Sequence, residues 1–365
     1  MKLLKKSIAI ILTLVFVLTL TACHSKDEVA LTIEGIDIKT GLYLNALVDC
    51  DSDARMVVDE QLSKNEESGT TSEETDYYSQ KVDGLEFTEY VKMKALERCK
   101  EFAFYQKLAN DGTIKLTDEE IANAETYAEQ YWDYYGYGYL YGANGISVES
   151  FKKVMLYSAY SNAYFMHIYG KGGEKEVAQS VIKKNMIDNY ALAYVLTSNY
   201  VEGATDESKA ALKTKLEGFG KRLKNGEDYL KIYNELNGTN EKAPEKTEDG
   251  PKNQYAQIIG EGDTADFDEV YEMKVGDYQV IETEDKSGLT LYVRLDIQSD
   301  DYYLTYLNDT ILMDLKQDEF EKALKEILAD YKVEENTWAT GILDIEDIDY
   351  SDYESYVAAT QQVSY

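Results

Sequence analysis

Proline is almost absent from this chain, and its placement is the strongest constraint on the fold. The sequence has two prolines in 365 residues, Pro244 and Pro251, and both lie in one short segment. Because proline interrupts a helix interior, the rest of the chain can form long uninterrupted helices. Apolar residues at three- and four-residue spacing, from Val91 through Cys99 to Ala109, predict one such helix.

The first half of the chain reads as a strand pair followed by helices. Alternating apolar residues predict strands at 29–33 and 36–38, and a helix should follow from Thr40 to Val48. Residues 63–80 consist mainly of Glu, Ser, Thr and Gly with no apolar period, which predicts a loop. Thr117 begins a capping box, and it predicts the start of a further helix.

In the second half of the chain, the predicted strands and helices alternate. The predicted elements are a strand at 191–197, helices ending at Asn225 and Leu236, a loop at 237–253, a helix at 267–271 and a half-buried strand at 289–297. A long helix or helix pair over 304–331 follows. The acidic residues past Trp338 read as a weakly ordered tail.

The N-terminus has the three-part pattern of an export signal. Lysines precede an apolar run from Ile8 to Leu20, and the run ends in Leu20-Thr21-Ala22-Cys23. A transmembrane helix is the alternative, but the run falls short of the ~20 residues that a bilayer span needs. The segment resembles the signal and lipobox of bacterial lipoproteins. That resemblance implies removal of residues 1–22, lipidation of Cys23 and a membrane anchor on the extracytoplasmic face.

Acidic residues dominate the charge of the chain. The formal net charge is −32, and removal of the three lysines in residues 1–22 lowers it to −35. Such a surface repels nucleic-acid phosphates, and no basic patch stands out beyond residues 213–224, so we expect no nucleic-acid partner.

Two cysteines remain once Cys23 is lipidated. Cys50 and Cys99 can form a disulfide in an exported protein. Cys99 also falls on the apolar face of a predicted helix, where a buried free thiol is ordinary. The sequence leaves both alternatives open.

Motifs of common enzymes are missing. The sequence has no phosphate-binding loop, no Cys-x-x-Cys pair and no His-Glu-x-x-His motif. Its two histidines, His24 and His167, are too few for a multi-histidine metal site, and His167 reads as structural. We therefore expect no cofactor and no ATP-driven cycle.

One acidic pattern matches a calcium loop in part. Asp49, Asp51, Asp53 and Glu60 fall at positions 1, 3, 5 and 12 of an EF-hand loop. Ala54 stands where the sharp turn requires glycine. We interpret the match as a coincidence in an acidic chain, with calcium binding as the alternative.

Residues 191–297 resemble a parvulin-type peptidyl-prolyl isomerase domain. The matching pieces are Ala193-Tyr194-Val195-Leu196, Leu223-Lys224-Asn225-Gly226-Glu227-Asp228-Tyr229, Phe267 to Asp277, and Gly288 to Leu295. Residues 29–35 and the helices after them look like the N-terminal peptide-binding region of SurA and PrsA. With the lipobox, the whole chain resembles a PrsA-type extracytoplasmic foldase lipoprotein.

This resemblance implies an α+β fold in which a mainly helical SurA/PrsA-like clamp carries an inserted parvulin-like domain. The implied parts are a signal peptide at 1–22, a helical peptide-binding region at 27–190, a parvulin-like domain at 191–300, a C-terminal helix at 301–338 that completes the helical region, and an acidic tail at 339–365.

The parvulin resemblance fails at the expected catalytic positions. Parvulin sites hold two histidines, and the matching positions here are Tyr194 and Thr290. The resemblance therefore implies weak or lost isomerase activity. The alternative is an active isomerase with a rearranged site around Tyr194, Asp228 and Thr290. Such a site would have to lower a rotation barrier of ~18–20 kcal/mol about the prolyl bond.

The high tyrosine content is a further indication of function. The chain has 33 tyrosines, and seven of them lie between Tyr127 and Tyr141. Large rings with few torsions suit weak contacts with many unfolded chains. The candidate client-binding residues are Tyr131, Trp132, Tyr134, Tyr135, Tyr137 and Tyr139. The alternative is that these rings pack a helical hairpin, with Gly136 and Gly138 at its bend.

Together these features favour a membrane-anchored chaperone that holds newly exported, unfolded polypeptides without ATP. Two other functions stay open: an active prolyl isomerase, and a surface lipoprotein that binds one ligand or adheres.

Overall fold

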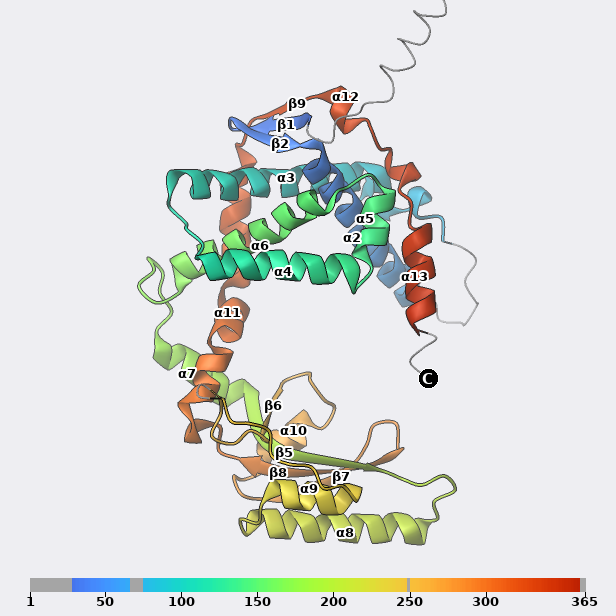
Figure 1. Cartoon of the computed structure of the whole chain (residues 1–365), viewed down its shortest axis with the longest axis vertical. Helices are drawn as coiled ribbons and strands as arrows, with labels where there is room; N and C mark the ends of the chain where they lie inside the picture. Colours follow the sequence, from blue (N-terminus) through green and yellow to red (C-terminus); the bar gives the residue numbers. More distant parts are fainter. Residues whose placement is uncertain (1–27, 66–74, 248–249, 362–365) are drawn as a thin grey trace, which may run out of the picture. The chain divides into compact units, whose positions relative to one another are not determined.

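The computed structural model describes residues 28–65, 75–247 and 250–361. The predicted signal, lipobox and Cys23 lie outside these residues. The fold is mixed α and β, mainly helical, with small antiparallel sheets. The described residues form two compact units: unit 1 comprises those up to Ile168 together with those from Glu319 onwards, and unit 2 comprises those from Tyr169 to Asp318 (Figure 1).

A small sheet in unit 1 joins segments from both ends of the chain. Strands β1 (Val29–Ile33) and β2 (Ile36–Lys39) form the expected antiparallel pair, turned at Glu34 and Gly35, which have positive φ. The third strand, β9 (Val333–Glu335), pairs antiparallel with β1. The C-terminal segment therefore completes the sheet that the N-terminal segment begins.

The strand pair is followed in the chain by a series of helices. They are α2 (Thr40–Asn65), α3 (Phe87–Asp111), α4 (Asp118–Asp133), α5 (Tyr137–Ala143) and α6 (Val148–Tyr169), with a short 3-10 turn η1 (Tyr77–Ser79) and a hairpin of β3 (Lys81–Val82) and β4 (Leu85–Glu86) between α2 and α3. The predicted capping box is confirmed: the Thr117 side chain accepts from the backbone of Glu120, and the Glu120 carboxylate accepts from the backbone of Thr117.

Helix α2 is longer than the sequence predicts. It continues past Val48 to Asn65, because Cys50, Ala54 and Val58 extend its buried face at four-residue spacing. The predicted loop at 63–80 is therefore wrong at 63–65, which are helical, and at the 3-10 turn η1.

The predicted weakly ordered tail is also wrong for the part that the structure describes. After α11 (Asp301–Ala329) and β9, the chain forms α12 (Thr337–Thr340), η3 (Ile345–Asp347) and α13 (Ser351–Gln361). Ala339, Ile345 and Ile348 are buried. The Asn144 side chain also bonds the backbone of Asp349 twice, at 2.9 Å each. A few buried apolar residues thus fix a segment whose composition is acidic.

Unit 2 is built on a four-stranded antiparallel sheet. The strand order is β6 (Gln257–Gly260), β5 (Tyr190–Asn199), β8 (Gly288–Leu295) and β7 (Tyr278–Glu282). Helices α8 (Asp206–Lys224) and α9 (Tyr229–Asn237) follow β5 in the chain and lie together beside the sheet (Figure 1). The expected order of strand, helices, loop, helix and strand is confirmed, whereas β6 and β7 were not predicted.

Strand β8 is buried on both faces, so the predicted half-buried strand is wrong. Leu289, Leu291 and Val293 pack against the residues of α8 and α9. Tyr292 lies in a second cluster with residues of α10 (Phe267–Glu272) on the opposite face. Helices cover both faces, which a two-residue alternation alone does not reveal.

Unit 2 extends beyond the predicted domain at 191–300. Helix α7 (Gln179–Asn189) and the start of α11 share an apolar cluster with Leu192 of β5. The 3-10 turn η2 (Ile297–Ser299) leads from β8 into α11. No helix in the described ranges is long and apolar enough to cross a membrane.

Among the described residues, Cys50 and Cys99 are free and buried. The structure therefore forms the buried thiols and not the alternative disulfide. Burial raises the pKa of the Cys50 thiol to about 12, so this thiol is protonated and unreactive at neutral pH.

Candidate functional site

Exposed tyrosines gather at the end of α4 and in α5. We call the rings of Tyr127, Tyr131, Tyr134, Tyr135 and Tyr139 the tyrosine surface. Their exposed fractions range from 39% at Tyr131 to 75% at Tyr134. Three of these rings are in contact, with centroids 5.1 Å apart for Tyr131 and Tyr135 and 5.2 Å for Tyr134 and Tyr135. Contiguous exposed rings of this kind mark interaction sites more often than single ones do.

The turn between α4 and α5 brings these rings together. Gly136 has a φ of +77°, a conformation that glycine adopts without strain, and it starts α5. On the inner side of α4, Ala124 and Ala128 are the buried residues. The helix therefore packs inward through alanines, and its tyrosines remain outside.

Other aromatic residues of the same stretch are packed. Trp132, Tyr137 and Tyr141 stack with one another and with Phe151 of α6, at centroid distances of 5.1–6.4 Å. Of the six candidate client-binding residues, Tyr131, Tyr134, Tyr135 and Tyr139 are exposed, whereas Trp132 and Tyr137 are partly buried. Each of the two interpretations of this stretch thus describes some of its rings.

The C-terminal helix α13 lies beside α5 and joins this surface (Figure 1). The Tyr356 ring stacks on Tyr139 with centroids 5.0 Å apart, and its hydroxyl donates to the backbone carbonyl of Tyr134. Tyr353 contacts Tyr137. The sequence prediction missed these residues because they are far from α4 and α5 in the chain.

The four carboxylates of the calcium pattern lie along one continuous helix. Asp49 accepts from the Tyr141 hydroxyl at 2.6 Å and from Arg98 at 3.2 Å, and Asp53 also accepts from Arg98. Asp51 accepts from Arg55, and Glu60 accepts from Lys64. A helix cannot wrap these groups around one ion as a loop does. The structure therefore does not form the loop that the calcium pattern requires, and among residues 28–65, 75–247 and 250–361 no group of acidic, His or Cys residues is placed to hold a metal ion.

Arg55 is the centre of a polar contact that sequence reasoning missed. Its guanidinium lies 4.6 Å from the ring centroids of both Tyr77 and Tyr350, and it bonds Asp51 at 2.6 Å. The Tyr350 hydroxyl donates to the same Asp51 oxygen at 2.7 Å. Burial raises the pKa of Asp51 despite these partners. The group ties the C-terminal segment to α2.

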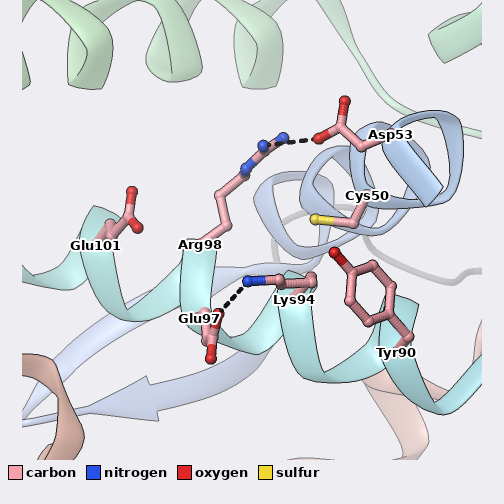
Figure 2. Close-up of a pocket in the computed structure, with 7 residues that line it drawn as sticks. All are labelled: Cys50, Asp53, Tyr90, Lys94, Glu97, Arg98 and Glu101. Atoms are coloured by element: carbon pink, nitrogen blue, oxygen red, sulfur yellow. Dashed lines mark hydrogen bonds and ion pairs between the residues drawn. The ribbon is translucent and has the colours of Figure 1, made fainter. Parts of the chain in front are cut away.

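A pocket of about 230 Å³ opens between α2 and α3 (Figure 2). Its lining residues are Cys50 and Asp53 from α2 and Tyr90, Lys94, Glu97, Arg98 and Glu101 from α3. Sequence reasoning did not identify it. The charged residues of α3 do recur at three- and four-residue spacing, which places them on one helix face.

In unit 2, the structure does not bring the degenerate catalytic positions together. Tyr194 pairs in register with Val293, and Thr290 pairs with Thr197. Successive strand residues point to opposite faces, so Tyr194 and Thr290 lie on opposite faces of the sheet. This arrangement does not form the rearranged site around Tyr194, Asp228 and Thr290 that the alternative requires.

Each of these positions has a local structural role. Tyr194 stacks on Tyr229 with centroids 4.9 Å apart and accepts a hydrogen bond from Asn253 at 2.8 Å. The hydroxyls of Thr290 and Thr197 are 3.0 Å apart. Asp228 caps α9 by accepting from the Lys231 backbone at 3.0 Å. Each of the three side chains therefore makes a contact that stabilises the local structure.

Comparison with known proteins gives a limited result. No protein-family model and no curated protein matches the sequence. Among solved structures, the chain is similar to PrsA from Bacillus subtilis, with 13% identity and a TM-score of 0.33 over 67% of this chain and 87% of that one. It is also similar to foldase protein PrsA from Streptococcus pneumoniae, with 13% identity and a TM-score of 0.37 over 71% and 88% of the two chains. The foldase protein PrsA from Lactococcus lactis gives 13% identity and a TM-score of 0.38 over 86% and 97%.

Proposed function

We propose that this protein is a lipid-anchored chaperone on the extracytoplasmic face of the membrane, and that it binds unfolded exported polypeptides without ATP. The observation that carries the proposal is the tyrosine surface. A folded chain normally buries large rings, yet here neighbouring rings are exposed. An exposed aromatic surface on a protein with an export signal suits a partner that also exposes apolar groups.

Tyrosine suits such a partner because of its shape and chemistry. The ring offers a large contact area with few torsions to immobilise, and the hydroxyl tolerates water. Contacts of this kind are weak and depend little on sequence. Release then needs no nucleotide, because folding of the client buries the groups that the tyrosine surface contacts.

Unit 2 is proposed as a parvulin-like module that serves as a scaffold or docking part. The support is the order of its elements and the separation of Tyr194 from Thr290 on opposite faces of the sheet. Rotation about a prolyl bond has a barrier of ~18–20 kcal/mol, and lowering it requires polar groups that converge on one peptide. A protease-coupled proline-peptide assay should detect little or no catalysis by this protein.

The membrane anchor rests on Leu20-Thr21-Ala22-Cys23. Acylation at Cys23 would give two or more chains on one residue, enough for stable anchoring. Substitution Cys23→Ser should release the protein from the membrane fraction, and mass spectrometry of the wild-type N-terminus should find acyl chains on Cys23. An unmodified N-terminus in the membrane fraction would contradict the anchor.

The test of the chaperone function is suppression of aggregation. Residues 24–365 should keep an unfolded secreted protein in solution at a stoichiometric ratio, without ATP, and should act on several unrelated clients. No suppression with any client would reject the proposal. Saturable binding to one folded ligand, without suppression, would instead support the surface-ligand function.

A further inference from the structure

The pocket between α2 and α3 has the size of a site for one side chain. Its volume of about 230 Å³ is below the range of about 300–1,000 Å³ that is typical of pockets for whole small molecules. All of its lining residues belong to unit 1, and none belongs to the tyrosine surface. It is therefore a separate candidate site.

The charges around the pocket are not balanced. Three carboxylates, Asp53, Glu97 and Glu101, and two cations, Lys94 and Arg98, line it. Arg98 bonds Asp53 at 3.2 Å and Lys94 bonds Glu97 at 3.0 Å, as the dashed lines in Figure 2 show. Both cations thus have a carboxylate partner, and one carboxylate is left over.

Glu101 is the carboxylate that remains. Within the part of the chain that the structure describes, no hydrogen bond or ion pair to its side chain is found, and it lies apart from both pairs (Figure 2). It is only partly exposed. Burial raises the pKa of this carboxyl, with neighbouring Arg98 opposing the rise. An ionised group in such a place is costly until a cation approaches it.

We propose that this pocket binds the cationic side chain of a lysine or arginine from a polypeptide, with Glu101 as its counter-ion. Long basic side chains can lay their aliphatic stem along the wall of a pocket while the charged end reaches a polar group, and a pocket of this size admits one such side chain. Tyr90 lies at the other end of the pocket from Glu101 (Figure 2), and its ring already faces an ammonium, because the Nζ atom of Lys94 lies 5.9 Å from its centroid.

The charges favour a cation over an anion. An anion would have to compete with Glu97 for Lys94 and with Asp49 and Asp53 for Arg98. A cation has Glu101 available. The net charge of −32 also favours basic segments at longer range. That the occupant belongs to an exported polypeptide rests on the proposed function, whereas the cation preference rests on the pocket alone.

The test uses small probes that need no chaperone activity. Nα-acetyl-lysine methylamide and Nα-acetyl-arginine methylamide should bind the full mature chain, as measured by NMR titration, and should shift resonances of α2 and α3. Nα-acetyl-norleucine methylamide, which keeps the stem and lacks the charge, should bind at least about tenfold more weakly. The relative response to the lysine and arginine probes tells which cation the pocket prefers.

Two variants complete the test. Glu101→Gln keeps the side-chain volume and should weaken both cationic probes at least about fivefold. Glu125→Gln removes an exposed carboxylate on α4 and should leave binding unchanged. Equal binding of the norleucine probe, or full binding of the cationic probes by a folded Glu101→Gln variant, would overturn the proposal. Because the probes are not unfolded clients, that failure is distinct from a failure of aggregation suppression.

Discussion

Two groups of tyrosines, one in each unit, have opposite environments. In unit 1 the tyrosine surface exposes its rings, whereas in unit 2 Tyr194, Tyr229, Tyr233 and Tyr255 stack at centroid distances of 4.9–6.2 Å, a group that we call the tyrosine stack. Tyr229 is only 9% exposed and its hydroxyl donates to the Val195 carbonyl at 3.0 Å. The same residue type is therefore exposed in one group and part of the core in the other.

The difference comes from which residues the neighbouring elements bury. Helix α4 packs inward through Ala124 and Ala128, so Tyr127, Tyr131 and Tyr134, spaced by four and three residues, form a stripe on another face. In unit 2, helices α8 and α9 cover the sheet face that carries Tyr194. Aromatic periodicity marks a helix face, but the residues on the other faces decide whether that face is core or surface.

The largest effect is expected in the tyrosine stack. Tyr229→Ala removes a buried ring and should lower the free energy of unfolding of unit 2 by about 3–5 kcal/mol, the usual cost of deleting a large aromatic side chain from a core. Urea unfolding followed by near-ultraviolet circular dichroism measures it. Tyr229→Phe keeps the ring and loses one hydrogen bond, so it should cost about 1 kcal/mol. Equal losses in both variants would show that the hydroxyl, and not the packed ring, stabilises this region.

A smaller effect is expected where a hydroxyl, not a ring, makes the main contact. Tyr350→Phe leaves a buried Asp51 oxygen with Arg55 alone and should cost about 1–3 kcal/mol of unfolding free energy. Tyr353→Phe is the matched control in α13, because its hydroxyl has no hydrogen bond within the described segments and its ring contact with Tyr137 remains. A Tyr350→Phe variant as stable as the control would show that the polar contact does not hold the C-terminal segment.

At the tyrosine surface, substitutions should reduce aggregation suppression without lowering the free energy of unfolding. The triple variant Tyr131→Ala, Tyr134→Ala, Tyr135→Ala should change the unfolding free energy little, since exposed substitutions usually stay within about ±0.5 kcal/mol each. It should nevertheless reduce aggregation suppression several-fold. Tyr306→Ala is the control, because that ring on α11 is 63% exposed and lies in unit 2. An equal loss in the control would mean that any exposed tyrosine serves, and not this surface.

The smallest effect concerns Glu101 and depends on pH. Burial raises the folded-state pKa of this carboxyl, so its protonated form favours the folded state, and that contribution is lost as the pH rises through the folded pKa. Glu101→Gln should therefore raise the unfolding temperature at pH 7.5 by up to about 2–4 °C, the shift that about 1 kcal/mol produces in a chain of this size. Below the ordinary glutamate pKa of about 4.3 the difference should vanish. A difference that persists at pH 3.5 would point to packing instead of charge.

The sequence predicted local features well and non-local ones poorly. The strand pair at 29–38, the capping box at Thr117 and the order of elements in unit 2 depend on neighbouring residues, and the structure confirms them. The pairing of β9 with β1, the extent of α2 and the ordered tail depend on contacts between distant segments. Composition alone does not contain those contacts.

For the candidate sites too, the sequence predicted some features and missed those that depend on contacts between distant segments. Exposure of Tyr131, Tyr134, Tyr135 and Tyr139 agrees with the binding interpretation, and packing of Trp132 and Tyr137 agrees with the alternative. The resemblance aligned Tyr194 and Thr290 with catalytic positions, but strand register decides which face each side chain occupies. The pocket at Glu101 required the pairing of α2 with α3, which a single sequence does not give.

Photo-crosslinking tests the central claim most directly. A benzophenone amino acid is placed at position 134 on the tyrosine surface or at position 306 in unit 2, and each protein is irradiated with an unfolded secreted client. The account predicts strong client crosslinks from position 134, weak ones from position 306, and loss of both when the client is folded beforehand. Crosslinks from position 306 as strong as those from 134, or crosslinks to the folded client, would contradict binding of unfolded polypeptides at the tyrosine surface.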